Sequence, residues 1–213
     1  MSRLLDALPA DERAAAEAAL ADSTVVALPR GAQRVAERMP PAALLVIEDG
    51  VVAVTSYRPT QARRMVVDVG GAGSVVLAPG RGERLEALTD AWVTAMTEHG
   101  RAALLRLPSA AAALAGALEA SVRAGRESLA QFGNVRRSDR LRDKLLQLAR
   151  EHGRVDSFGV RLDLPLTHEL LGEMVGASRE TVTWAFAELA REGFVRRDGR
   201  LYRLAVSPDE LAS

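Results

Sequence analysis

Apolar residues between positions 24 and 107 come in short runs, which are separated by turns that contain glycine or proline. Many short strands joined by such turns are typical of a β-sandwich or β-roll. A helix is predicted before them, over 4–21, because acidic residues follow Pro9 where its first turn would be. The runs that predict strands are 24–28, 43–47, 51–56, 65–69, 74–77, 92–97 and 102–107.

A longer apolar pattern, with leucines at helical spacing, begins at Pro108 and continues to about Gly133. The spacing is close to that of a coiled-coil seam. One interpretation is a helix packed on its own domain. The other, which we favour, is a dimerisation helix that pairs with a second copy of the chain. The apolar stripe consists of Leu114, Leu118, Val122, Leu129 and Phe132.

Three segments with different patterns therefore follow one another along the chain. Residues 1–107 contain the predicted strands, 108–137 contain the long helix and a hinge at Arg136-Arg137, and 138–213 form a helical C-terminal domain. Ser138 and Asp139 are suited to cap a helix over 140–151, whose leucines at 141, 145, 146 and 148 face inward. This order predicts an α+β protein.

Two short helices with a tight turn between them are predicted from 168 to 192. Thr167 is suited to cap the first helix, and Gly176 fits the left-handed backbone position that ends it. Ser178 is suited to cap the second helix. Two helices joined by a three-residue turn form a helix-turn-helix. The inward-facing positions of the second helix are Val182, Phe186 and Leu189.

A β-hairpin is predicted directly after these helices, over 194–204. Asp198-Gly199 at its centre is the dipeptide most typical of a tight hairpin turn. A helix-turn-helix followed by a hairpin, the wing, forms a winged helix. We expect the arginines of the wing to face the phosphates of a nucleic acid, because guanidinium groups bind phosphate strongly. These arginines are Arg196, Arg197, Arg200 and Arg203.

The run Gly176-Ala177-Ser178-Arg179-Glu180-Thr181-Val182 carries a specific resemblance. With Leu171-Gly172 before it and Gly193-Phe194-Val195 after it, it resembles the C-terminal domain of the Crp/Fnr family of bacterial transcription regulators. The resemblance is strong over 138–206 and weak over 4–107. It implies a β-roll of the cyclic-nucleotide-binding type, a long dimerisation helix and a winged helix-turn-helix. It also implies a homodimer that binds a palindromic operator in double-stranded DNA and acts with RNA polymerase.

The resemblance places the DNA-reading residues at the start of the second helix of the helix-turn-helix. Arg179 is suited to donate two hydrogen bonds to O6 and N7 of guanine, and Glu180 to accept one from N4 of cytosine. Further candidates for contacts to phosphates or bases are Thr167, Ser178 and Thr181, and the candidates on the wing are Arg197 and Arg200.

One position in this helix departs from the family. Members usually have an arginine four residues after the glutamate, whereas this chain has Trp184. An indole offers one hydrogen-bond donor and no charge. Because Trp184 is out of phase with the inward positions, we expect it to be exposed without DNA and to lie against the DNA backbone or a thymine methyl group. The alternative is a side chain that is turned into the protein.

The first domain departs further from the family. Members that bind cyclic nucleotides carry a Gly-Glu pair and an Arg-Ser/Thr-Ala segment, which hold the ribose and the cyclic phosphate. Here Gly73 is followed by Ser74, and the second segment reads Leu88-Thr89-Asp90-Ala91. Because Asp90 would repel a phosphate, we expect that cyclic AMP does not control this protein. The identity of an effector stays open, and no cofactor is predicted.

Composition narrows the chemistry further. The 213 residues carry 28 basic and 28 acidic side chains, so the formal net charge is zero. This argues against a protein whose whole surface binds nucleic acid, but it is compatible with a local basic face. The absence of cysteine excludes disulfides, iron–sulfur clusters and thiolate zinc sites. The three histidines, His99, His152 and His168, have no metal-ligand spacing, so no metal site and no catalytic site are predicted.

The alternative to a DNA-binding regulator is an enzyme or ligand-binding protein with a cupin-like β-roll and an appended helical domain. A cupin metal site needs clustered histidines and carboxylates, which three scattered histidines cannot supply. We therefore favour a regulator without enzymatic activity. The chain has no run of 18 apolar residues and no signal-peptide pattern, which predicts a cytoplasmic protein without membrane contact.

Overall fold

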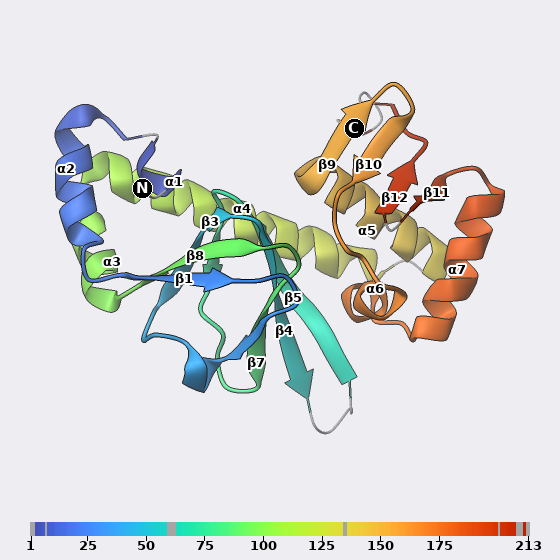
Figure 1. Cartoon of the computed structure of the whole chain (residues 1–213), viewed down its shortest axis with the longest axis horizontal. Coiled ribbons are helices and arrows are strands. Elements are labelled where there is room, and N and C mark those ends of the chain that lie inside the picture. Colours follow the sequence, from blue (N-terminus) through green and yellow to red (C-terminus); the bar gives the residue numbers. More distant parts are fainter. Residues whose placement is uncertain are drawn as a thin grey trace. The chain divides into compact units, whose positions relative to one another are not determined.

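The computed structural model describes residues 3–6, 8–58, 63–133, 136–199, 201–207 and 211 (Figure 1). The chain divides into two compact units. The first comprises residues 1–62 and 67–125, and the second comprises residues 63–66 and 126–213. The division at 125/126 falls inside a long helix, whereas the boundaries predicted at 107 and 137 coincide with the starts of two helices.

Two four-stranded sheets form the centre of the first unit (Figure 1). The first sheet has the strand order β1-β8-β3-β6 and the second has the order β2-β7-β4-β5. The strands of the first sheet are β1 (Thr24–Leu28), β3 (Leu44–Asp49), β6 (Val75–Leu77) and β8 (Ala91–Met96). Those of the second are β2 (Gln33–Val35), β4 (Val51–Arg58), β5 (Arg63–Gly71) and β7 (Glu83–Ala87). The predicted β-roll is confirmed.

Strand β3 faces two different cores. Leu45 and Ile47 are buried in the core between the two sheets. Leu44 and Val46 lie on the other face of the strand, in a second core that helices form with the first sheet. Because the side chains of a strand alternate between its faces, four consecutive apolar residues indicate a strand that is covered on both sides.

The helices of this second core lie at both ends of the first unit's sequence. They are α1 (Arg3–Asp6), α2 (Ala10–Ala19), α3 (Glu98–Leu104) and α4 (Pro108–Gln131). The carboxylate of Glu12 in α2 accepts hydrogen bonds from the backbone N–H groups of Ser109 (3.0 Å) and Ala110 (3.2 Å). These amides begin α4 and have no partner within the helix, so Glu12 caps α4 and fixes the two helices to each other.

Several predictions for this unit are wrong. The helix predicted over 4–21 is two helices, because Pro9 precedes α2 as its N-cap. The strand predicted over 102–107 lies partly in helix α3, whose first turn is fixed by a hydrogen bond from the Gly100 N–H to Thr97 Oγ1 at 3.1 Å. Strands β2 and β7 and the short 3-10 helix η1 (Ala36–Arg38) were not predicted, because charged and polar residues dominate them.

The apolar stripe on α4 is divided between different environments. Leu114 is 2% exposed in the core beneath the first sheet, so the prediction that it contacts a second copy of the chain is wrong. Leu118 is half-buried beside the same core. Val122 and Leu129 are 56% and 70% exposed, and they remain open to a partner. The first half of the helix covers its own domain, and the large apolar side chains that α4 presents to solvent lie in its second half.

The second unit contains the helices α5 (Arg137–His152), α6 (His168–Val175) and α7 (Arg179–Arg191). Its sheet has the order β11-β12-β10-β9 (Figure 1). Strands β11 (Val195–Asp198) and β12 (Leu201–Leu204) form the predicted wing, whereas the hairpin of β9 (Gly153–Asp156) and β10 (Gly159–Leu162) was not predicted. Helix α5 starts earlier than expected and has no side-chain cap, and its leucine at 146 is only half-buried.

Among the described residues, no single helix is long and apolar enough to cross a membrane. Helices α3 and α4 reach that length and apolar character only when they are taken together, and the chain bends by 117° between them.

Candidate DNA-binding surface

The two helices of the predicted helix-turn-helix are fixed at their ends by side chains and by one glycine. At the start of α6, Thr167 Oγ1 accepts a hydrogen bond from the Leu170 N–H at 3.1 Å. Gly176 ends that helix in the left-handed conformation, with φ of 66°. At the start of α7, Ser178 Oγ accepts a hydrogen bond from the Thr181 N–H at 3.2 Å. The caps and the turn are those that the sequence predicts.

Helix α7, the recognition helix, buries one face and presents the other to solvent. Val182, Phe186 and Leu189 are buried, as predicted. Arg179 and Glu180 are exposed on the first turn. Hydrogen bonds from the Glu180 backbone amide and from the Ser178 side chain hold the pKa of the Glu180 carboxyl below its usual value. Glu180 is therefore an anionic hydrogen-bond acceptor at neutral pH, beside a cationic donor.

His168 connects the helix-turn-helix to the wing, because its ring also stacks on that of Tyr202 in β12 at 6.5 Å between centroids; the sequence does not predict this role. Its Nδ1 lies 2.9 Å from Thr183 Oγ1, and its ring stacks on Phe186 at 5.2 Å between centroids. Burial lowers the pKa of His168, and the positive charges of Arg179 and Arg197 lower it further. Arg179 of the recognition helix and Arg197 of the wing therefore both lie near this imidazole.

The arginines of the wing do not all face solvent. Arg197 is exposed, and its Nε donates to the backbone carbonyl of Gly199 at 3.1 Å. Arg200 lies outside the described residues. Arg203 is only 7% exposed, so the expectation that it faces phosphates is wrong. Its guanidinium forms ion pairs with Asp156 of β9 and with Asp198 Oδ2, the latter at 2.9 Å.

Arg203 is a structural residue that supports the wing from behind. The side-chain hydrogen bond from Arg203 holds the pKa of Asp156 below its usual value. Because Asp156 lies 47 positions before its partner, the pair joins the β9–β10 hairpin to the wing. A buried guanidinium needs such anionic partners, since an unpaired buried charge is strongly unfavourable.

Trp184 is 79% exposed, as predicted for the protein without DNA. It lines an open groove of about 460 Å³ together with Thr181, Arg136, Arg137 and Arg191. Arg137 Nη1 donates a hydrogen bond to Thr181 Oγ1 at 3.1 Å, so the start of α5 lies directly against the recognition helix. The sequence predicts only a hinge at Arg136-Arg137, because no local pattern shows that these residues contact α7.

These features define a winged helix-turn-helix with a cationic face. Residues 139–212 match the family model of the Crp-like helix-turn-helix domain. A CRP-like cAMP-activated global transcriptional regulator of Mycobacterium tuberculosis is 41% identical over 61 residues, which is 29% of this chain and 27% of that protein. The match therefore covers about a quarter of the length of this curated relative.

Solved structures extend the likeness in fold to most of the chain. A variant of CooA from Carboxydothermus hydrogenoformans has a TM-score of 0.73 at 17% identity, over 92% of this chain and 88% of that one. A CRP-family regulator from Thermus thermophilus has a TM-score of 0.69 at 22% identity, over 87% and 94%. The c-di-GMP-responsive global regulator CLP from Xanthomonas campestris has a TM-score of 0.70 at 18% identity, over 91% and 99%.

Residues 139–212 therefore form a Crp-like helix-turn-helix domain, and most of the chain shares its fold with solved regulators of the CRP and CRP/FNR families, in agreement with the resemblance in its sequence. The alternative of a cupin-like enzyme or ligand-binding protein with an appended helical domain receives no support from these comparisons.

Proposed function

We propose that this protein is a transcription regulator that binds a specific sequence of double-stranded DNA as a homodimer, without control by cyclic AMP. The observation that supports this most directly is the exposed first turn of α7, which carries Arg179 and Glu180, together with the exposed Arg197 of the wing, which lies near His168 as Arg179 does. A recognition helix in the major groove brings such residues to base edges, while wing cations bind phosphates. Such a regulator acts with RNA polymerase in the cytoplasm.

The hydroxyl candidates have a double role in this proposal. Thr167 Oγ1 and Ser178 Oγ accept hydrogen bonds from backbone amides, which positions the two helices. A hydroxyl group also carries one donor, and the donor of Thr167 remains for a phosphate oxygen. Thr181 is engaged by Ser178 and Arg137, so its contribution is to hold Arg137 beside the DNA.

The cyclic-nucleotide segment supports regulation without cyclic AMP. Thr89 Oγ1 accepts a hydrogen bond from the Val51 N–H at 2.9 Å, and Asp90 Oδ1 accepts one from the Arg30 N–H at 2.8 Å. These residues therefore fix a turn between β7 and β8, where family members that bind cyclic nucleotides place an arginine and a hydroxyl. The curated relative from Mycobacterium tuberculosis is described as cAMP-activated, and this chain carries the carboxylate of Asp90 in the turn between β7 and β8.

Selection of bound fragments from a random pool of double-stranded DNA tests the proposal. The full chain, without added nucleotide, is expected to enrich a palindrome whose half-sites are about 34 Å apart between centres. The same selection with cyclic AMP is expected to give the same sequence and affinity. Enrichment of no sequence would contradict specific DNA binding, and enrichment only with cyclic AMP would contradict independence from the nucleotide.

Arg179→Ala is expected to weaken binding to the selected site by about 1–3 kcal/mol and to relax base choice at one position of each half-site. Arg197→Ala is the matched control, because it removes an exposed cation that contacts phosphate and no base. It is expected to weaken binding to all sequences alike and to lower the dependence of affinity on salt. Titrations at several salt concentrations, with the selected site and with random DNA, separate the two. An equal loss on both DNAs for Arg179→Ala would refute its role as a base reader.

Trp184→Arg is expected to strengthen binding and to move the preferred half-site towards that of family members with arginine there. We infer that the groove beside Trp184 receives the sugar–phosphate backbone, since Arg136, Arg137 and Arg191 line it. A new guanidinium adds a contact to guanine or phosphate of about 1 kcal/mol or more. Because the indole is exposed, the melting temperature is expected to change little. An unchanged site with a much lower melting temperature would instead assign Trp184 a structural role.

Light scattering is expected to give about twice the chain mass of 22.8 kDa at micromolar concentration. We infer that the second half of α4 forms the dimer contact through the exposed Val122 and Leu129. The double variant Val122→Glu/Leu129→Glu places charges in that contact and is expected to dissociate the dimer. Val155→Glu is a suitable control, because Val155 is 57% exposed but lies on β9. A wild-type mass near that of one chain would contradict the dimer.

A further inference from the structure

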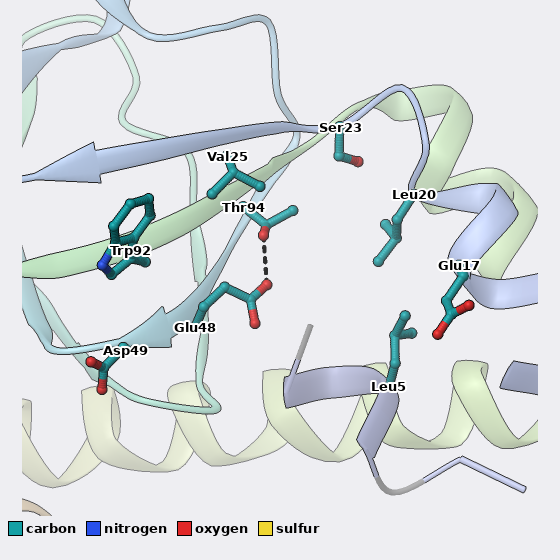
Figure 2. Close-up of a pocket in the computed structure, with 9 residues that line it drawn as sticks. All are labelled: Leu5, Glu17, Leu20, Ser23, Val25, Glu48, Asp49, Trp92 and Thr94. Atoms are coloured by element: carbon teal, nitrogen blue, oxygen red, sulfur yellow. Dashed lines mark hydrogen bonds between the residues drawn. The ribbon is translucent and has the colours of Figure 1, made fainter. Parts of the chain in front are cut away.

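A pocket of about 510 Å³ lies on the first sheet (Figure 2). Strands β1 and β8 contribute Val25 and Trp92, and helices α1 and α2 contribute Leu5 and Glu17. Val25 and Trp92 are 58% and 53% exposed. A volume in this range is typical of small-molecule sites, and large apolar side chains left open on one sheet face are typical of a binding surface.

A β-bulge supplies acidic groups to this pocket. In the pairing of β3 with β8, Ile47 is opposite Val93 and Asp49 is opposite Trp92, so Glu48 is an extra residue. Adjacent side chains of a regular strand point to opposite faces, but the bulge allows both Glu48 and Asp49 to line the pocket. Thr94 Oγ1 donates a hydrogen bond to Glu48 Oε1 at 2.5 Å, which holds this carboxylate between Trp92 and Leu5 (Figure 2).

The polar groups of the pocket are complementary to a cation with N–H donors. Glu17 adds a third carboxylate, and no arginine, lysine or histidine is among the lining residues that the structure describes. Ser23 and Thr94 add hydroxyl groups to the lining. Within the part of the chain that the structure describes, no three acidic or histidine side chains lie close enough to hold a metal ion.

We propose that this pocket binds an organic ammonium ion, that is, an amine with an apolar body. Its N–H groups would donate to the carboxylates of Glu48 and Asp49, and its apolar body would cover Val25. The face of the Trp92 ring adds an attraction for the cation. A metal ion would not cover the apolar side chains of the pocket, and an anion would be repelled by its three carboxylates. This site is independent of the DNA-binding surface, so its test does not depend on the proposed function.

Fluorescence of Trp92 reports binding directly. The chain has two tryptophans, so Trp184→Phe leaves Trp92 as the single tryptophan, which is excited selectively at wavelengths where the two tyrosines do not absorb. The probe is n-hexylamine, which is an ammonium ion at pH 7, and 1-hexanol and hexanoate are its neutral and anionic counterparts of equal length. We expect a saturable change with hexylamine, binding at least about tenfold weaker with hexanol, and no saturable change with hexanoate. Equal affinity for the amine and the alcohol, or no saturable change with the amine, would overturn the proposal.

Substitutions in the pocket provide the second test. In the Trp184→Phe background, Glu48→Gln/Asp49→Asn is expected to lower the affinity for hexylamine about tenfold and to leave that for hexanol nearly unchanged. Glu37→Gln, an exposed carboxylate of the same unit outside the pocket, is the matched control and is expected to change neither. If the double variant fails to fold by circular dichroism, the exposed Asp49→Asn alone carries the test. Unchanged affinity for hexylamine in the folded variants would overturn the proposal.

Discussion

Gly176→Ala is expected to destabilise the second unit by about 2–5 kcal/mol and to abolish DNA binding at temperatures where the wild type still binds. Two effects add at this position. The backbone φ of 66° is unfavourable for any residue with a Cβ atom, by about 1–2 kcal/mol. A Cβ atom would also lie 2.7 Å from Cε1 of Phe132, a ring that follows α4, and such overpacking costs about 1–3 kcal/mol.

Gly193→Ala is the matched control for this experiment. Gly193 also has a positive φ, of 76°, but a Cβ atom there would meet nothing within 4 Å. It is therefore expected to lose only the backbone contribution of about 1–2 kcal/mol. Denaturant unfolding of both variants, followed by circular dichroism, gives the two losses. Equal losses would show that the contact between Gly176 and Phe132 does not restrict the turn.

The single lysine of the chain is expected to titrate near pH 8, well below the usual range of a lysine. Lys144 of α5 is 5% exposed, and its Nζ donates to Ser128 Oγ and to Gln147 Oε1, each at 2.7 Å. Burial lowers the pKa of Lys144 to about 8, although the charges of Glu151 and Glu127 oppose the shift. Since the chain has no other lysine, a lysine-selective ¹³C label gives one Nζ-adjacent resonance whose titration measures this pKa.

The same shift determines how stability depends on pH. Between about pH 8 and 10.5 the unfolded chain binds a proton that folded Lys144 has released, so the free energy of unfolding rises with pH across this window. The full difference is on the order of 3 kcal/mol, and below pH 8 the folded protein carries the whole cost of the buried charge. Lys144→Met is expected to remove this rise. If the free energy of unfolding changed with pH in the same way for wild type and variant across this window, the lowered pKa of Lys144 would be contradicted.

The helix-turn-helix and the wing could be predicted because their signals are local. Thr167, Gly176 and Ser178 each act within four residues of their own position, and Asp198-Gly199 fixes the hairpin directly. Arg203 could not be assigned correctly, because the residue that draws it inward is Asp156, 47 positions away. For the same reason Arg136-Arg137 was interpreted as a hinge, since its contact with Thr181 spans 44 positions.

The first unit shows a similar limit. Its strands between glycine turns were predictable, but the apolar run at 102–107 carries no local sign that Thr97 caps a helix before it. The stripe on α4 was assigned to a single surface, whereas its first half covers the first sheet and its second half faces solvent. A periodic pattern shows which face of a helix is apolar and leaves open what covers each part of it.

Because Lys144 is buried between α4 and α5, covalent labelling of its amine can measure how often this contact opens. An acylating reagent reaches the only side-chain amine of this chain when Ser128 and Gln147 release it, that is, when the two helices open locally. Under conditions where reclosing is fast, the labelling rate falls about tenfold for each 1.4 kcal/mol of opening free energy. Mass spectrometry of the acetylated peptide would then measure the free energy of opening between α4 and α5, with and without DNA, from the labelling of Lys144 Nζ alone.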